Sequence, residues 1–247
     1  MKKKKSLFYR FSAKRSFLET DLLSGFTDIH SHYLPGVDDG FQTKEDAINA
    51  LDAMIDVGVK RVYLTPHVMA DLPENYPDFL KERFLNFQQD APKGVELRLA
   101  AEYMLDADFF KQKQAGLLPI GKNYILIEMS YMYPSPELIN IIYDLQVTGF
   151  VPLLAHPERY LFMDEGQYKM LKEKGCKYQL NLMSLSRQYG ERVFDTAWYL
   201  LQHGMYDFVG TDIHQLRVFL HNMTHLKLTT KEQDLLYNLI RQNERLW

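Results

Sequence analysis

The stretch Phe26-Thr-Asp-Ile-His30-Ser-His32 is a short apolar run that ends in two histidines, and Asp38-Asp39-Gly40 follows closely. Side chains alternate along a strand, so the two rings of a His-x-His pair lie on one face. Alone, such a pair is more often two hydrogen-bonded histidines than a metal site, and Asp-Asp-Gly alone indicates a turn. The meaning of this stretch therefore depends on the rest of the chain.

Six further runs rich in β-branched and aromatic residues follow the first one along the chain. Near-continuous apolarity is typical of strands that are buried on both faces of a parallel sheet. The seven predicted strands are Phe26–His30, Arg61–Thr65, Val95–Ala101, Tyr124–Glu128, Val151–Ala155, Tyr178–Leu182 and Asp207–Thr211.

Segments with helical periodicity separate these strands. In the first of them, Ala47, Leu51 and Met54 fall on one face, and Thr43 precedes it as a capping residue. The predicted helices are Lys44–Val57, Phe79–Gln89, Asp108–Gln114, Glu137–Thr148, Glu165–Lys174, Glu191–His203 and Lys231–Arg245. Alternating strands and helices predict an α/β fold, as a barrel or a doubly wound sheet, in a single domain.

Titratable residues follow six of the seven predicted strands at their carboxyl ends. Loops at that end of an α/β barrel converge on one mouth, where barrel enzymes build their sites. Chance burial does not sort residues in this way, so we expect a joint site. Its candidate metal ligands are His30, His32, Asp38, Asp39, His67, Glu102, Glu128, His156, Asp212 and His214.

The chemistry of this set is that of hard to borderline divalent cations. Imidazoles mixed with carboxylates and without thiolates suit manganese, iron or zinc, and the set is too large for one ion. Two or three ions sharing a bridging carboxylate suit phosphate ester hydrolysis, because they bind phosphoryl oxygens and lower the pKa of a bridging water. Arg159 is the natural phosphate clamp, and its alternative is a surface salt bridge with Glu158 or Asp164.

Composition narrows the class of protein. The 247 residues carry 29 Lys and Arg against 32 Asp and Glu, and 46% are hydrophobic, which is typical of a globular domain. Cys176 is the only cysteine, which excludes an internal disulfide and favours a reducing compartment. No stretch approaches the roughly 18 apolar residues of a membrane span, and no signal peptide is evident, so we expect a cytoplasmic protein.

Basic residues are concentrated at the N-terminus. Residues 1–15 contain seven Lys and Arg and no acid, so the remainder of the chain is acidic. This extension is either a solvated leader or a patch that contacts anionic lipid or a phosphorylated partner. An acidic body argues against nucleic-acid binding, which needs positive charge over the contact face.

The motifs together resemble the PHP (polymerase and histidinol phosphatase) superfamily, and more narrowly the bacterial metal-dependent protein-tyrosine phosphatases of capsule and exopolysaccharide operons. The resemblance runs in order from Phe26 to His225. It rests on His30-Ser-His32, Leu34-Pro-Gly-Val-Asp38-Asp39-Gly40, Thr65-Pro-His67, Ala101-Glu102-Tyr103, Leu126-Ile-Glu128, Ala155-His156-Pro-Glu-Arg159 and Gly210-Thr-Asp212-Ile-His214.

This resemblance implies a distorted (β/α)7 TIM-like barrel of the PHP type over residues 26–247, after a basic extension over residues 1–25. It also implies two to three divalent ions, usually manganese. The first would lie on His30, His32, Glu102 and Asp212, and Glu102 would bridge to a second on His156 and Glu128. The third would lie on His67, His214 and either Asp38 or Asp39, of which the spacing from His32 favours Asp38.

The implied reaction is attack of a metal-bridging hydroxide on the phosphorus of phosphotyrosine, with Arg159 and Asp212 in catalytic roles and Arg217 as a second phosphate contact. Cys176 lacks the phosphate-cradling loop of a cysteine phosphatase, so we expect a buried structural thiol. The implied substrate is the tyrosine-rich tail of a membrane-associated kinase that regulates polysaccharide export. The basic N-terminus would contact that tail or the membrane, and an oligomer is compatible with the sequence.

Two departures from the family and several alternatives accompany this interpretation. The chain carries about 25 residues before the first motif, and Val68 stands where a second histidine is common. The nearest alternative is a small-molecule phosphatase of the same superfamily, such as histidinol phosphatase. A nuclease, a non-catalytic binding module and a metal-dependent amidohydrolase are the others.

Tyr131 and Tyr133 either form an apolar wall for a phenyl ring, together with Met132, or pack within their loop.

Overall fold

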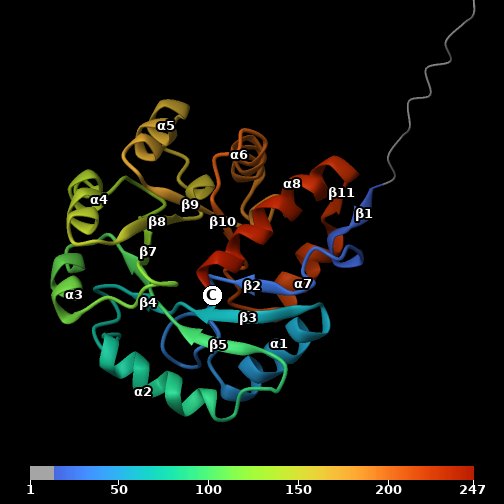
Figure 1. The fold of residues 1–247 in the computed structure, drawn as a ribbon, viewed down its shortest axis with the longest axis horizontal. Coiled ribbons are helices and arrows are strands. Elements are labelled where there is room, and N and C mark those ends of the chain that lie inside the picture. Colours follow the sequence, from blue (N-terminus) through green and yellow to red (C-terminus); the bar gives the residue numbers. More distant parts are fainter. Residues whose placement is uncertain (1–13) are drawn as a thin grey trace, which may run out of the picture.

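The computed structural model describes residues 14–247, which form a curled sheet of mostly parallel strands with helices around it (Figure 1). One sheet has the order β2-β3-β5 and a second the order β10-β9-β8-β7-β6-β4, with every pair parallel. The strands are β2 (Phe26–Asp28), β3 (Val59–Leu64), β4 (His67–Val68), β5 (Glu96–Leu99), β6 (Glu102–Met104), β7 (Tyr124–Glu128), β8 (Val151–Ala155), β9 (Lys177–Asn181) and β10 (Phe208–Gly210).

The two sheets are continuous with each other through backbone hydrogen bonds. Thr65 and Pro66 separate β3 from β4, and the amide of Glu102 donates to the Pro66 carbonyl across that break at 3.1 Å. On the other side, Ser31 forms a parallel bridge with Ile213 just beyond β2 and β10. The strand ends that carry the predicted polar residues therefore surround one opening.

Helices cover the outside of the curled sheet. They are α1 (Lys44–Asp56), α2 (Pro77–Gln88), α3 (Phe109–Ala115), α4 (Leu138–Val147), α5 (Glu165–Glu173), α6 (Glu191–Gln202), α7 (Leu216–His225) and α8 (Thr230–Ile240). Short 3-10 helices complete the chain at η1 (Phe17–Glu19), η2 (Pro157–Arg159), η3 (Leu182–Ser186) and η4 (Arg241–Leu246). In α1, Thr43 caps the first turn and Ala47, Leu51 and Met54 are buried, as the sequence predicts.

The predicted strands and helices are found at their expected places, with shifts of a few residues at their ends. Several elements have no counterpart in the prediction. Among them, helix α7 follows the last polar motif, the short strands β4 and β6 follow the second and third predicted strands, and the last predicted helix ends in the 3-10 turn η4. No helix among residues 14–247 is both long and apolar enough to cross a membrane.

Residues preceding the first motif are part of the packed fold. Strand β1 (Arg15–Ser16) pairs antiparallel with β11 (Lys227–Leu228), and the Phe17 amide donates to the Leu226 carbonyl at 2.8 Å. The Phe17 side chain is 1% exposed. The packed chain thus begins before the predicted boundary at residue 26, while most of the basic extension lies outside the described residues.

Candidate metal centre

Four fully or almost fully buried side chains meet beyond the carboxyl ends of β2, β5 and β10. They are His30, His32, Glu102 and Asp212. The Nε2 atom of His30 lies 3.2 Å from Nε2 of His32, 3.0 Å from Oε2 of Glu102 and 3.3 Å from Oδ1 of Asp212. Four ligand atoms thus face a common point, which is the number and chemistry that one divalent cation requires.

The remaining ring nitrogens of the two histidines point away from that centre to acceptors. Nδ1 of His30 donates to the amide oxygen of Gln179 at 2.9 Å. Nδ1 of His32 donates to a carboxylate oxygen of Asp38 at 2.8 Å. An acceptor on Nδ1 fixes the tautomer in which the Nε2 lone pair is free to bind a metal. Two such lone pairs cannot bond each other, so the pair fits a cation.

A second group of donors adjoins the first through Glu102. Nδ1 of His67 lies 3.2 Å from Oε2 of Glu102 and 2.9 Å from Oε1 of Glu128. Nε2 of His156 lies 3.1 Å from the other oxygen of Glu102. Nδ1 of His67 and Oε1 of Glu128 are buried, and their contact with each other lacks hydrogen-bond geometry. Buried ligand atoms that meet without a hydrogen bond are expected where an ion completes the site.

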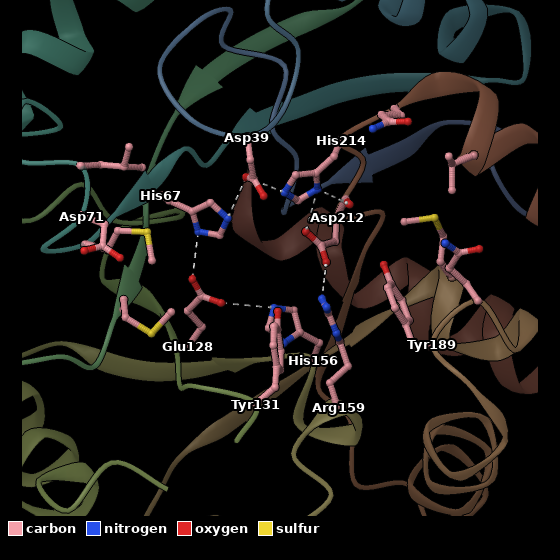
Figure 2. Close-up of a pocket in the computed structure, with 17 residues that line it drawn as sticks. Asp39, His67, Asp71, Glu128, Tyr131, His156, Arg159, Tyr189, Asp212 and His214 are labelled. Atoms are coloured by element: carbon pink, nitrogen blue, oxygen red, sulfur yellow. Dashed lines mark hydrogen bonds and ion pairs between the residues drawn. The ribbon is translucent and has the colours of Figure 1, made fainter. Parts of the chain in front are cut away.

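A third group lies at the outer side of the cluster and contains Asp39. Its Oδ1 lies 3.4 Å from Nε2 of His67 and 3.2 Å from Nε2 of His214, and the ring of His214 stacks on His32 at 3.9 Å. Asp39, His32, His67 and His214 can offer their ligand atoms to one ion. Figure 2 shows Asp39 between His67 and His214, with Glu128 and His156 on the opposite side of the cavity.

The structure separates the roles of the two adjacent aspartates. Oδ2 of Asp38 accepts from Nδ1 of His32 and from the backbone amide of His67 at 3.1 Å, and its Oδ1 accepts from the Gly40 amide at 3.0 Å. Asp38 thus positions His32 and the loop that carries His67. The spacing argument favoured Asp38 as the ligand, and the contacts favour Asp39.

Mutual electrostatics hold the cluster together when no metal is bound. Burial lowers the pKa of His30, His32 and His67, yet the carboxylates around them, chiefly Glu102, Asp38 and Asp212, raise it above its ordinary value. Burial likewise raises the pKa of Glu102 and Asp212, but the neighbouring histidines bring both below the usual range. The imidazoles and carboxylates thus favour each other's charged forms, as expected of a site built for a cation.

Backbone geometry brings the ligands close together. His156 and Asp212 adopt left-handed φ values of 35° and 50°, which non-glycine residues rarely do outside functional sites. A Cβ on Gly40 would lie 2.5 Å from Cβ of His32, and one on Gly210 would lie 2.5 Å from Cβ of His30. Both glycines are therefore required for the two rings to reach their positions.

Arg159 borders a cavity of about 610 Å³ next to the donor groups. Its guanidinium donates to Oδ2 of Asp212 at 3.3 Å and lies between two aromatic rings, 4.1 Å from the centre of Tyr131 and 4.2 Å from that of Tyr189 (Figure 2). It is 18% exposed, so part of its donor surface faces the cavity. Arg217, predicted as a second phosphate contact, is exposed on α7 and does not line the cavity.

Sequence reasoning missed the supporting residues from β9. Gln179 binds His30, and Nδ2 of Asn181 donates to Oδ2 of Asp212 at 2.7 Å and to the Tyr189 hydroxyl at 3.2 Å. Both are uncharged, so the sixth predicted strand was the one without a titratable end. Polar residues two positions apart in a buried strand were the available signal. Cys176 is buried, as predicted, and burial raises the pKa of its thiol to about 12.

Overlapping groups of candidate metal ligands beside a fixed arginine, around one opening of a parallel sheet, are the arrangement typical of metal-dependent hydrolases that act on phosphorylated substrates. Comparison with known proteins gives the family. A model of the capsular polysaccharide synthesis family CpsB/CapC matches residues 26–232, and the chain belongs to this family.

Relatives with curated names agree with this membership. The tyrosine-protein phosphatase YwqE of Bacillus subtilis is 30% identical over 203 residues, which cover 77% of this chain and 78% of YwqE. The tyrosine-protein phosphatase CpsB of Streptococcus agalactiae is 27% identical over 204 residues, covering 77% of this chain and 84% of CpsB.

Solved structures share the fold. One, described as YwqE from Bacillus subtilis and CpsB from Streptococcus pneumoniae, unique metal-dependent tyrosine phosphatases, matches with a TM-score of 0.74 at 24% identity, over 89% of this chain and 93% of that chain. A 5-methylcytosine deaminase from Klebsiella pneumoniae matches with a TM-score of 0.56 at 13% identity, over 90% of this chain and 74% of the deaminase. The fold alone therefore does not distinguish phosphatases from deaminases.

Proposed function

We propose that the protein is a metal-dependent protein-tyrosine phosphatase. The observation that carries this proposal is the position of Arg159, which faces the same cavity as Glu128, His156 and Asp212 and is held there by Asp212. A cation cluster beside a permanently charged, planar donor is suited to a tetrahedral dianion. The names of the curated relatives support the choice of substrate.

The proposed assignment follows the three donor groups. His30, His32, Glu102 and Asp212 would hold one ion, and His67 and His156 with Glu102 and Glu128 a second. His32, His67, His214 and Asp39 would hold a third. When bound, such ions bind phosphoryl oxygens, offset their charge and lower the pKa of water. Manganese is our proposal for the ions, with iron and zinc as alternatives of similar ligand preference.

The residues of the chain divide the remaining work. Arg159 would bind the equatorial oxygens of the phosphoryl group and stabilise their charge in the transition state. Asp212 orients Arg159 through the 3.3 Å hydrogen bond, and Asn181 in turn fixes Asp212. The rings of Tyr131 and Tyr189 hold the guanidinium between them. Because Arg217 is exposed on α7, we infer that Arg159 is the arginine that contacts the phosphate.

The broader proposals concern fold and setting. Backbone contacts join the sheet β2-β3-β5 to the sheet β10-β9-β8-β7-β6-β4. If β3 with β4 and β5 with β6 each count as one strand, this connection supports a distorted (β/α)7 barrel of the PHP type. The family description supports a role in capsule or exopolysaccharide synthesis. We propose that the substrate is the phosphotyrosine tail of a membrane-associated tyrosine kinase, reached from the cytoplasm.

The test is phosphate release by the manganese-loaded protein from a phosphotyrosine peptide, measured beside histidinol phosphate. We expect release from the peptide that is abolished by a chelator and reduced by Arg159→Ala, on the order of 10²- to 10³-fold in kcat, as for the loss of one transition-state donor. A preference for histidinol phosphate would favour the second candidate, a small-molecule phosphatase on the same site. Hydrolysis of neither ester by metal-loaded protein would overturn the proposal.

A further inference from the structure

We propose that a groove beside the metal cavity binds the polypeptide that flanks the phosphotyrosine and selects neutral or basic residues there. This inference rests on the proposed function and adds a substrate preference to it. The groove has a volume of about 490 Å³. Its lining includes Met69, Asp71, Met104, Asp106, Tyr133 and Glu137.

The groove adjoins the cavity. Met69, Asp71 and Met104 line both, so the two spaces are neighbours at these side chains. Three successive loops form the groove, those after β4, β6 and β7, and the same loops carry or follow His67, Glu102 and Glu128. In Figure 2, Asp71 and Tyr189 lie at opposite sides of the cavity, and the groove opens on the Asp71 side. A ligand bound at Arg159 can therefore extend into it.

The loop after β7 exposes large apolar side chains at this edge. Tyr131, Met132 and Tyr133 are 42%, 83% and 66% exposed, three in succession. Scattered apolar residues are ordinary on a protein surface, but a contiguous patch at the rim of a site indicates a contact surface. Tyrosine is also enriched among the residues that dominate binding energy in protein interfaces. Of the three, Tyr133 lines the groove, so a small phosphate ester held at Arg159 leaves it unused, whereas a polypeptide that enters the groove contacts it.

The charge of the groove is negative. Asp71, Asp106 and Glu137 line it, and no lysine, arginine or histidine does within residues 14–247. Asp106 is already committed, because its two oxygens accept from the backbone amides of Ala70 and Asp108. Asp71 remains to face a ligand, and so does one oxygen of Glu137, whose Oε2 accepts from Nδ2 of Asn140 at 2.8 Å. An acidic residue next to the phosphotyrosine would meet like charge there, while a lysine would meet opposite charge.

The groove adjoins the cavity and has a volume of only about 490 Å³. An extended chain advances about 3.3 Å per residue, so the residues that enter it are the few adjacent to the phosphotyrosine. The test compares two peptides that differ only in having lysine or glutamate at those positions with p-nitrophenyl phosphate, which cannot reach the groove. The variants are Tyr133→Ala and Glu137→Gln, since neither residue lines the metal cavity. Tyr143→Ala is the matched control, because Tyr143 is 69% exposed on α4 and lines neither space.

We expect Tyr133→Ala to raise KM for both peptides about fivefold or more, the loss of one interface anchor, with p-nitrophenyl phosphate turnover unchanged. Glu137→Gln should reduce the preference for the lysine peptide over the glutamate peptide by about two- to fivefold, as for an exposed ion pair. Tyr143→Ala should change none of these values. Equal effects on the peptides and the aryl phosphate, or no effect of either variant on the peptides, would overturn the proposal.

Binding separates this inference from the proposed function. The same peptides carrying a non-hydrolysable phosphonate in place of the phosphate report affinity for the metal-loaded protein without turnover. If the wild-type protein hydrolyses nothing, the proposed function fails, yet the affinities still decide the groove. Weaker binding of both phosphonopeptides to Tyr133→Ala, with a preference for lysine that Glu137→Gln reduces, supports the groove. Affinities that are the same for all three variants overturn it.

Discussion

The Nε2 atoms of His30 and His32 face each other across 3.2 Å, and each ring is held from behind by an acceptor on its Nδ1. For His30 the acceptor is the neutral amide of Gln179, and for His32 it is the carboxylate of Asp38. The two rings are thereby oriented before any ion binds. The position of the centre depends as much on these supporting residues as on the ligands themselves.

The two neighbouring aspartates should behave differently when their charge is removed. Asp39→Asn takes an oxygen ligand from the group that contains His67 and His214, so we expect the number of bound ions to fall by one at saturating manganese. Asp38→Asn removes the carboxylate behind His32 instead. We expect full occupancy at saturation and about 10- to 100-fold weaker affinity, as for other supporting residues of metal sites.

Metal content after equilibrium dialysis, measured over a range of manganese concentrations, distinguishes the two effects. Asp46→Asn is the matched control, because it makes the same substitution on the exposed first turn of α1. Loss of an ion from Asp38→Asn, with full occupancy in Asp39→Asn, would reverse the assignment.

Gly210 and Gly40 should not tolerate even one added carbon. A Cβ at either position would meet the Cβ of the adjacent histidine at 2.5 Å, much less than a van der Waals contact. We expect Gly210→Ala and Gly40→Ala to destabilise the protein by about 1–3 kcal/mol and to weaken metal binding, because the histidine ring must move. Urea unfolding with metal titration measures both effects.

Gly166→Ala is the matched control for these substitutions. Gly166 lies within α5, where its added Cβ would meet an aspartate oxygen at 3.3 Å and alanine favours the helix. Metal affinity unchanged in Gly210→Ala would show that His30 does not need this close approach.

Much of the fold was predictable because its strands are buried on both faces. Runs such as Tyr124–Glu128 and Val151–Ala155 agree with the structure residue for residue, since each buries four consecutive positions after a half-buried first residue. The short strands β4 and β6, which follow β3 and β5 after a break, were not predictable. Pro66 has no amide proton to donate, yet its carbonyl accepts from the Glu102 amide, so pairing across the break depends on how the strands are aligned in the folded sheet.

The residues that meet in the cluster were predictable as a set, but the contacts that each of them makes were not. Asp38 and Asp39 are adjacent and chemically identical, and only the backbone path of their turn decides which one faces His67 and His214. Arg217 has the right chemistry, but it falls on the exposed side of α7, a helix that the periodicity did not indicate. Gln179 and Asn181 were missed because uncharged residues carry no metal-ligand signal by themselves.

The two rings around Arg159 should contribute measurably to phosphate binding. Tyr131→Leu or Tyr189→Leu removes one stacked ring and releases the guanidinium, so we expect kcat/KM for p-nitrophenyl phosphate to fall by about 2- to 30-fold per ring. Tyr131→Phe keeps the ring and should retain activity. Tyr189→Phe also loses the hydrogen bond from Asn181, so it should show a small additional loss. Leucine variants as active as the wild type would show that the rings do not position Arg159.

Metal affinity should rise with pH. Carboxylates keep the pKa of His30, His32 and His67 above the ordinary 6.5, so these rings bind protons more tightly than a free imidazole when no metal is bound. Metal must displace those protons, and calorimetry in buffers of different ionisation enthalpy should show proton release on binding. Equal manganese affinity at pH 6 and pH 8 would contradict this coupling.

Stability of the metal-free protein should show the matching linkage. A histidine whose folded-state pKa lies above its unfolded-state value contributes stability that is complete below about pH 6.5 and is lost as the pH rises through the folded-state pKa. Glu102 and Asp212 have lowered pKa values, so their contribution is present above about pH 4 and disappears in acid. The urea midpoint of the metal-free protein should therefore be highest at an intermediate pH and lower at both more acidic and more alkaline pH.

Cys176 should be dispensable for catalysis. It is the one cysteine of the chain, it is fully buried, and burial raises the pKa of its thiol to about 12, so the thiolate fraction at pH 8 is on the order of 10⁻⁴. We expect Cys176→Ala to retain kcat with manganese, at a cost in stability of about 1–2 kcal/mol from the lost packing. A thiol reagent should label the native protein only after unfolding. Loss of activity in Cys176→Ala with its metals retained would require a cysteine-based mechanism instead.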